Sequence, residues 1–480
     1  MSYDTEAGLP ESQRSDSNIV DWDGQDDLNF PQNWQKSIRL GHVAVAGTTA
    51  FLSNIGSTGF AIAASSLAHE FHITNSTLET LTVTLYLLGF ALGPLVIAPL
   101  SETYGRLPVY YTCLTCSIVF LNACAQAPNV AVFLVFRFIT GISGSGPATI
   151  GGGTIADVMP KESRGGAMAL YGLGPLMGPV IGPIINGFVV EHLNWRWIFR
   201  ILSIATSIVT LCAVFFMRET YAPLLLQRKA ARLRKETGNY ALCTNYDKKP
   251  GTLQTLRRAI VRPIKMLTLS PIVMALSIFT AFVFGLQVLL ITTFPNVYKE
   301  QYGWSQSISG LAYLGLGVGI LIALVAFGML SDKVVNARAK AKGEKWKPEG
   351  RFLIMMWFSP AWPIGFFWYG WAAYYSTHWI LPIIGTAWIG FGSLSIMLPI
   401  QLYLVDAFGP VTAASALAAN TVLRAFAACF LPLAGPKLYE TLNLGWGNSL
   451  LGFLAVAFTT LPVIFFKYGE LIRMKWPVEL

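Results

Sequence analysis

Runs of about 20 consecutive apolar residues recur along the whole chain, and they constrain its fold more than any other feature. Such a run is long enough to cross the hydrocarbon core of a bilayer as one helix. Because a segment inside the bilayer must satisfy its backbone hydrogen bonds internally, these runs are expected to be helices rather than open strands. Charged residues make up only 12% of the chain, against about 25% in soluble domains. The sequence therefore predicts an all-α polytopic membrane protein.

The runs form two groups of six, separated by a polar and basic segment. The first group is expected at 41–64, 79–100, 108–126, 130–155, 165–188 and 197–217. The second group is expected at 271–294, 308–330, 352–373, 379–404, 412–435 and 447–467. The predicted organisation is a disordered tail at 1–40, a six-helix half at 41–217, a linker at 218–270, a second half at 271–467 and a tail at 468–480.

Lysine and arginine are distributed unequally between the loops on the two sides of the predicted spans. One set of loops carries Arg106, Lys161, Arg164 and a basic cluster at 333–351, whereas the other carries only Arg196, Lys299 and Lys437. Because basic loops stay on the cytosolic side, both termini are expected in the cytosol. The linker contains a basic amphipathic helix at 223–235, which fits a linker and topology anchor better than a regulatory element.

The first outer loop contains Asn75 in an Asn-Ser-Thr sequence, which makes it a candidate glycosylation site. The plasma membrane is the expected location, with the vacuolar membrane as the alternative.

Several function classes are excluded by what the sequence lacks. The net charge of +9 does not indicate nucleic-acid binding, because the basic residues lie in loops between apolar runs. There is no Gly-x4-Gly-Lys-Ser/Thr loop for ATP and no His-Glu-x-x-His zinc motif. Cys113 and Cys116 are spaced like metal ligands, but they lie in an apolar run and fit buried small side chains better. We expect no enzymatic activity, no cofactor and no metal site.

A short motif repeats at the cytosolic end of each half. Ala98-x-Leu-Ser-Glu102 follows the second predicted span, and Gly328-x-Leu-Ser-Asp332 follows the eighth. Parallel halves with a binding site between them are typical of secondary transporters.

Further motifs make the chain resemble the major facilitator superfamily, in particular the fungal twelve-span drug:proton antiporters. Arg137-x3-Gly-x2-Gly144 is similar to that family's intramembrane arginine motif. The glycine-rich fifth run is similar to its antiporter signature, which is carried here by Gly165, Gly174, Gly178, Pro179, Gly182 and Pro183. The segment at 218–223 also resembles a Pro-Glu-Thr-Tyr-Ala-Pro segment of the fungal drug exporters. The resemblance covers about residues 30–470 and implies the major facilitator fold, a monomer in the bilayer, and export of a small molecule against protons.

Charged residues near the spans are the candidates for coupling and gating, since an unpaired charge in a bilayer is costly. Arg137 and Glu79 are the candidates for proton coupling; the alternatives are a buried anchor for Arg137 and an interfacial cap for Glu79. A gate of ion pairs that breaks on switching is expected at the inner helix ends. Its candidate residues are Glu102, Gly105, Arg106, Asp157, Arg164, Asp332, Lys333 and Asp406.

Polar and aromatic residues near the middle of the spans are candidates for a substrate cavity. They are Asn54, Tyr86, Asn186, Gln287, Trp388, Asn420 and Arg424. Arg424 could instead pair with Asp406. A cavity of this kind suits amphipathic organic molecules, including cations. Gly174, Gly178 and Gly182 are expected to form a close-packed seam between the two halves.

The sequence therefore predicts a proton-driven exporter of lipophilic drugs, toxins or secondary metabolites. A polyamine exporter on the same scaffold is the nearest alternative, and a markedly acidic cavity would favour it. A nutrient uptake permease and a membrane receptor fit less well, because of the fifth-span signature and the two complete halves.

Overall fold

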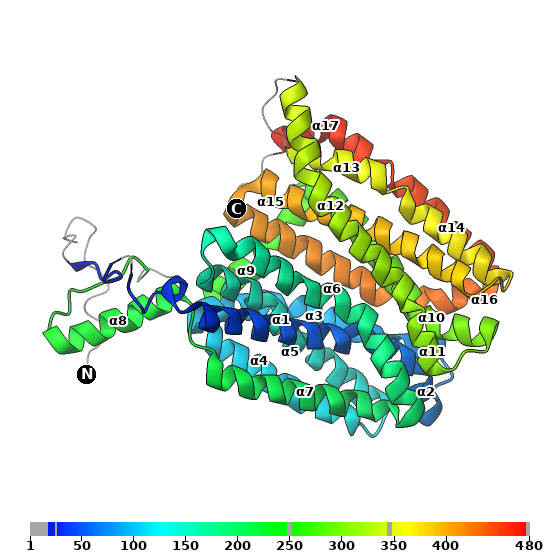
Figure 1. Cartoon of the computed structure of the whole chain (residues 1–480), viewed down its shortest axis with the longest axis horizontal. Coiled ribbons are helices and arrows are strands. Elements are labelled where there is room, and N and C mark those ends of the chain that lie inside the picture. Colours follow the sequence, from blue (N-terminus) through cyan, green and yellow to red (C-terminus); the bar gives the residue numbers. More distant parts are fainter. Residues whose placement is uncertain (1–17, 25, 247–251, 343–347, 477–480) are drawn as a thin grey trace.

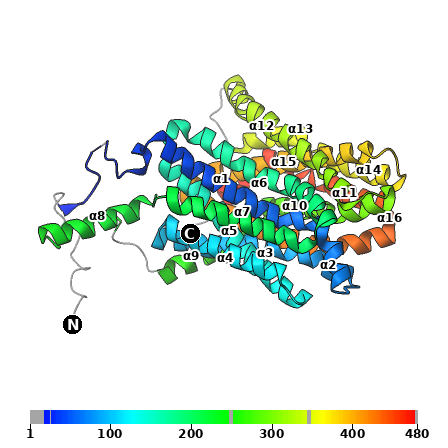
Figure 2. The ribbon, with the colours of Figure 1, turned by 60° about the horizontal axis from the view of Figure 1, so that its bottom comes forward.

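The helices form one elongated bundle, and the chain enters and leaves it at the same end (Figures 1 and 2). The computed structural model describes residues 18–24, 26–246, 252–342 and 348–476, without the side chains of 161–162, 252–253, 331–333, 335–342 and 409–411. In this part of the chain every regular element is a helix, apart from an isolated bridge between Ile19 and Cys243. We call the end where the chain enters and leaves the terminal end, and the opposite end the far end.

The first half consists of six long helices and two short ones. They are α1 (Lys36–Thr58), η4 (Gly59–Ala63), α2 (Ala64–Glu70), α3 (Ser76–Tyr104), α4 (Arg106–Ala125), α5 (Val130–Val158), α6 (Lys161–His192) and α7 (Trp195–Phe216). Asparagines cap the helices that begin at the far end, because a side-chain oxygen satisfies a free N–H of the first turn. Asn75 caps α3, Asn129 caps α5 and Asn194 caps α7.

The second half follows two linker helices, α8 (Ala222–Thr237) and α9 (Thr252–Leu269). Its elements are α10 (Pro271–Tyr302), α11 (Gln306–Leu311), α12 (Tyr313–Lys342), η5 (Pro348–Gly350), α13 (Arg351–Phe358), α14 (Ala361–Tyr374), α15 (Ile380–Phe430), η6 (Leu431–Ala434), α16 (Gly435–Phe458) and α17 (Leu461–Lys475). α15 contains two apolar stretches, one ending at Phe408 and one beginning at Thr412, which run in opposite directions in Figure 1. The prediction of an all-α protein with two six-helix halves is confirmed.

Nine stretches of the described residues are long and apolar enough to cross a membrane, against twelve predicted runs. The difference has three local causes. α1 is less apolar than the other long helices of its half, the ninth run is broken into α13 and α14 before Pro360, and the last two runs join in one stretch at Thr412–Lys475. The proline breaks the helix because it lacks a backbone N–H.

The two halves meet along a few helix pairs. α3 packs on α15, and α6 packs on α11 and α12. The contact between α6 and α11 is close, since a Cβ placed on Gly310 would lie 2.8 Å from the carbonyl oxygen of Pro183. Tyr86 and Leu87 of α3 also lie in one apolar cluster with Val288 of α10 and Ala428 of α15.

Residues 18–24 and 26–29 pack against the linker at the terminal end, next to α8, which projects from the bundle in Figure 1. The ammonium of Lys229 on α8 lies 2.6 Å from the Asp23 carboxylate and 3.8 Å from that of Asp27. Backbone N–H groups of Asp23 and Asn29 donate to Asp27, and these bonds lower the pKa of its carboxyl group. The prediction of a disordered tail therefore does not hold for these residues, because acidic side chains of the tail pair with a basic side chain of the linker. Residues 1–17 of the predicted tail lie outside the described part.

Candidate functional site

A cavity of about 390 Å³ lies between the two halves, near the middle of the bundle. It is lined by residues of α1, α3, α5 and α6 from the first half and of α10, α12 and α15 from the second. Its walls are mainly apolar, and include Leu87, Phe90, Leu176, Val180, Phe284, Val288, Ile291, Leu316, Ile320, Leu394 and Met397. A cavity of this size and lining is in the range that binds drug-sized molecules.

Three of the seven residues predicted for the substrate cavity line it: Asn54, Gln287 and Arg424. Phe284, Gln287, Val288 and Ile291 share one face of α10, because side chains three and four residues apart on a helix are neighbours.

The other four predicted cavity residues do not line this cavity. The Tyr86 hydroxyl donates to the carbonyl of Ser53 at 2.8 Å, and Asn420 donates to Thr280 Oγ1 at 2.6 Å. Asn186 is buried against Gly59, between α6 and η4. Trp388 is 42% exposed and contacts Phe391, so it lies on the outer surface of the bundle rather than inside it.

Arg137 is fully buried and held entirely by neutral groups. Its guanidinium donates to the carbonyls of Gly56 at 2.8 Å, Ser57 at 3.1 Å and Thr82 at 3.1 Å. It also lies over the rings of Tyr86, Phe60 and Phe199, at 4.9, 5.1 and 5.6 Å from their centroids. Gly56 and Ser57 belong to the last turn of α1, where helix-end carbonyls need donors. This geometry ties α5 to α1 and α3.

Arg424 is a second arginine inside the bundle, but it is half-buried and its surroundings differ from those of Arg137. It lies over the Phe284 ring at 4.8 Å, its Nε is buried, and it donates no hydrogen bond to any described residue. It does not pair with Asp406, because the guanidinium of Arg351 lies 3.2 Å from that carboxylate instead.

Three predicted gate residues of the first half, Gly105, Arg106 and Asp157, lie close together at the terminal end. Arg106 Nε lies 3.4 Å from Asp157 Oδ2, and Arg106 also donates to Ser101 and lies over the Tyr221 ring. Gly105, with φ of +100°, makes the turn between α3 and α4. A Cβ there would lie 2.5 Å from Glu219 Oε2, so both the conformation and the space require glycine.

Other predicted gate residues take different positions. Arg164 donates to the carbonyls of Ala156 and Met159, at 2.8 and 3.3 Å, and so covers the end of α5. Glu102 is exposed at the end of α3. The side chains of Asp332 and Lys333 lie outside the described residues.

A matching arrangement occurs at the terminal end of the second half. Arg351 begins α13 and pairs with Asp406, as Arg106 begins α4 and pairs with Asp157. Arg473 of α17 also pairs with Glu349 at 3.2 Å. Each of these three pairs lies within one half, so they brace the helices of that half rather than link the halves directly.

The glycines of the fifth-run signature pack against α1, not against the second half. A Cβ on Gly178 would lie 2.5 Å from the Asn54 Cβ, one on Gly174 would lie 2.9 Å from the Gly47 carbonyl, and one on Gly182 would lie 3.3 Å from Ile55. The predicted seam between halves is therefore wrong for these glycines, because their face of α6 points into the first half. Gly165 has open space around it.

The prolines and their neighbours on α6 take the adjacent face. Pro175 and Pro179 line the cavity, and the Pro183 carbonyl faces Gly310 of the second half. The residue Tyr171, one turn earlier, also lines the cavity and donates to the Ala148 carbonyl at 2.9 Å.

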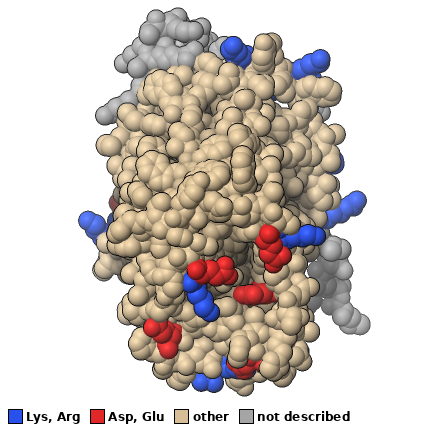
Figure 3. Space-filling view, turned by 90° about the vertical axis from the view of Figure 1, so that its right-hand side faces the viewer, with Lys and Arg blue, Asp and Glu red and all other residues tan. Residues whose placement is uncertain are grey.

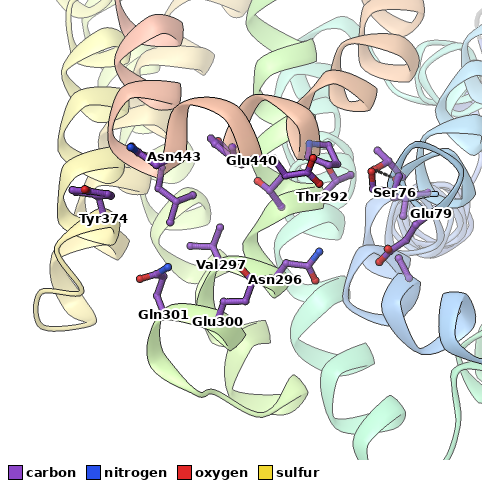
Figure 4. A pocket seen from close by; sticks show the side chains of 17 residues that line it. Ser76, Glu79, Thr292, Asn296, Val297, Glu300, Gln301, Tyr374, Glu440 and Asn443 are labelled. Atoms are coloured by element: carbon purple, nitrogen blue, oxygen red, sulfur yellow. Dashed lines mark hydrogen bonds between the residues drawn. The ribbon is translucent and has the colours of Figure 1, made fainter. Parts of the chain in front are cut away.

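A second hollow, about 450 Å³, opens toward the far end, and we call it the vestibule. The face that contains the far end carries acidic side chains around a hollow (Figure 3). Glu79 of α3, Glu300 of α10 and Glu440 of α16 line the vestibule, together with Asn296 and other polar residues (Figure 4). Along α3 and α10 the vestibule residues are nearer the far end than the cavity residues, so the vestibule lies between the cavity and that end.

Several residues of these sites were missed from sequence. Glu219 is 7% exposed, and its carboxylate accepts the backbone N–H groups of Arg106, Leu107, Thr220 and Tyr221 at 2.9–3.1 Å. Glu219 lies inside the 218–223 segment that resembles the fungal exporters. Its position directly after a predicted span was the sequence feature that could have identified it. Tyr171 also lay inside a recognised motif, whereas no sequence pattern connected Glu300 and Glu440 with Glu79.

Comparisons with known proteins agree with this architecture. The family model of the Major Facilitator Superfamily matches residues 46–432. The MFS-type transporter mpsC of Macrophomina phaseolina is 60% identical over 476 residues, which covers 99% of this chain and 93% of that protein. The MFS transporter prlG of a fungal species (strain NRRL 50135) is 51% identical over 470 residues, covering 98% and 99%. A crystal structure of a D-xylose-proton symporter superposes with a TM-score of 0.66 at 19% identity, over 89% of this chain and 97% of that one, and supports the fold alone.

Proposed function

The chain belongs to the Major Facilitator Superfamily and is a multi-pass membrane transporter, and on that premise we propose that it exports amphipathic organic compounds by proton antiport. The observation that carries the proposal is the cavity of about 390 Å³ between the halves. Apolar and aromatic walls with few polar groups suit molecules such as drugs, toxins or secondary metabolites.

Alternating access fits the way the cavity is built. Each half supplies one side of it, and ion pairs such as Arg106–Asp157 and Arg351–Asp406 brace each half internally. The two halves can then rock as rigid units around a fixed site, as in other transporters made of two repeats.

Export is the proposed direction, with the terminal end in the cytosol and the vestibule facing out across the plasma membrane. The basic loops support this orientation, because they would lie on the cytosolic side. Glu79, in the vestibule, is the proposed group that takes up protons from outside. The signature glycines support the antiporter assignment by the family resemblance, and they make α1 and α6 one closely packed unit.

A polyamine exporter is the second candidate, and the vestibule favours it. Three carboxylates, on Glu79, Glu300 and Glu440, line one hollow and would attract a polycation. The positive Arg424 in the central cavity argues against a polycation there.

Retention assays in yeast cells that lack their own drug exporters test both candidates. Cells expressing the chain are loaded with lipophilic fluorescent dyes or with labelled spermidine, and retention is compared with that of cells carrying an empty vector, with and without a protonophore. The proposal predicts lower dye retention that the protonophore abolishes. Export that the protonophore leaves unchanged would contradict antiport, net accumulation would contradict export, and selective loss of spermidine would favour the second candidate.

A further inference from the structure

Resting on the proposed export function, we propose that the substrate is an organic anion whose acidic group pairs with Arg424 in the central cavity. The inference starts from two arginines inside the bundle: Arg137, which is fully buried, and Arg424, which is half-buried and lines the cavity. Three carbonyls accept from Arg137, whereas no described residue accepts from Arg424. A cation that is partly removed from water and has no acceptor is costly, and a bound group that supplies a negative charge removes this cost.

The surroundings of Arg424 within the cavity agree with an anionic partner. Among the described residues that line the cavity, Arg424 is the one with a full charge, and none is a carboxylate. The field in the cavity is therefore positive, which favours an anion and disfavours a cation.

A second unsatisfied group also lines the cavity. Thr58 is 3% exposed, and its hydroxyl has no hydrogen-bond partner among the described residues. A substrate with acceptor oxygens would satisfy this hydroxyl as well as the guanidinium, because both are donors.

The remaining walls specify the body of the substrate. Phe90, Leu176, Phe284, Val288 and Met397 present apolar surface in the same cavity. A small inorganic anion would leave this surface unfilled, whereas an apolar body would bury it. The cavity of about 390 Å³ thus fits a carboxylate, enolate or similar acid carried on a lipophilic skeleton.

The test uses three probes that share one BODIPY fluorophore: a propionate, its neutral methylamide and a trimethylammonium derivative. Inside-out vesicles that contain the full chain are energised, and probe uptake is measured for the wild type, Arg424→Gln, Arg424→Lys and the control Arg200→Gln. Arg200 is an exposed arginine of α7 that lies over Trp197, outside the cavity.

The wild type should carry the propionate at least tenfold faster than the other two probes. Arg424→Gln should reduce propionate uptake at least tenfold and leave methylamide uptake within twofold, Arg424→Lys should be intermediate, and Arg200→Gln should resemble the wild type. Unchanged propionate uptake by Arg424→Gln, or a wild-type preference for the trimethylammonium probe, would overturn the inference.

A binding measurement separates this inference from the proposed function. If the wild type carries none of the probes, that result counts against the export proposal. Thermal stabilisation of the purified wild type by each probe then tests separately whether the protein has an anion-binding site. Stabilisation by the propionate but not by the methylamide or by inorganic phosphate supports the site, even if Arg424→Gln fails to fold. Equal effects of propionate and methylamide, a matching effect of phosphate, or no effect of the propionate would overturn it.

Discussion

Arg137 and Arg424 show how differently one residue type is used at two positions inside the bundle. The guanidinium of Arg137 is planar and offers donors in several directions, and its three accepting carbonyls belong to two helices. No carboxylate is paired with it in the described part of the chain. Its contacts therefore support the role of an anchor between α1, α3 and α5 more directly than a role in proton coupling.

Replacing Arg137 with lysine separates these two roles. A lysine ammonium lacks the planar fork, so Arg137→Lys should lose one or more of the carbonyl bonds and about 1–3 kcal/mol of stability. Thermal unfolding of the purified protein measures this loss. The pH dependence of the residual export should match that of the wild type, whereas a displaced pH profile would support the coupling role.

The sequence was informative about which charges lie inside the bundle and uninformative about their partners. Arg137 and Arg424 stand out because an arginine inside an apolar run is rare and costly. Their surroundings depend on α1, α3 and α10, which are distant in sequence and are brought close only by tertiary packing. Trp388 could not be placed correctly from sequence, since a tryptophan in a span fits either a cavity or the outer surface of the bundle.

At the scale of helices, the contact between α1 and α6 depends on glycines with little space around them. Gly178→Ala would place a methyl group 2.5 Å from the Asn54 Cβ, and would therefore push α6 away from α1. Because Pro175 and Pro179 of the same helix line the cavity, the displacement should also deform the site. We expect export to fall at least tenfold while the protein still inserts in the membrane.

Gly172→Ala is the matched control for this prediction, because nothing lies within 4 Å of a Cβ at Gly172. Alanine also has the higher helix propensity, so this variant should be as stable as the wild type or slightly more stable. Export is measured by dye retention and insertion by the amount of full-length protein in membranes. Equal export by Gly178→Ala and Gly172→Ala would show that the close contact is not required.

The start of α4 depends on an acid that lies more than a hundred residues away in sequence. The Glu219 carboxylate accepts the N–H groups of Arg106 and Leu107, which have no partner within their own helix. Glu219→Ala should therefore cost about 1–2 kcal/mol, as loss of a helix cap does, and lower the thermal unfolding temperature. Glu236→Ala, which removes an exposed pair with Arg232 on α8, should have little effect. Similar unfolding temperatures for the two variants would contradict this function of Glu219.

Helix positions followed from sequence more readily than helix neighbours. The run expected at 130–155 corresponds to α5 at Val130–Val158, because apolar composition and length define a span directly. The four-residue spacing of Gly174, Gly178 and Gly182 predicted a close-packed face on α6 but contained no information on the helix that covers it. That helix is α1, so the predicted stripe was present and its predicted partner was wrong.

At the scale of the whole molecule, the repeat detected in sequence extends further than the motif that revealed it. The Arg106–Asp157 and Arg351–Asp406 pairs occupy corresponding places in the two halves, and the second pair was not predicted. Arg351 was counted only as a basic loop residue, because its distance from Asp406 along the chain hides the contact. Glu300 and Glu440 were missed for the same reason, since they and the predicted Glu79 come from three separate helices.

The proposed transport cycle predicts how much charge moves for each substrate molecule. If one organic monoanion leaves the cytosol and one proton enters, two positive charges in effect move inward. An inside-negative potential then drives export, with about 2.3 kcal/mol per charge for each 100 mV. Export should consequently respond to the membrane potential even when the pH is equal on both sides.

Reversal potentials measured with the purified protein in liposomes give this charge ratio. A ratio of two, with sensitivity to a pH gradient, is the expected result, because Arg424 selects an anion and antiport adds a proton. A ratio of one that is insensitive to pH would mean that the anion moves alone, which would contradict antiport but retain the anion site. A ratio of one that is sensitive to pH would indicate a neutral substrate. A ratio of zero would indicate a cationic substrate. Either result would contradict the proposed role of Arg424. Because a potential already drives an anion outward, the structure permits export of such a substrate even when the proton gradient is small.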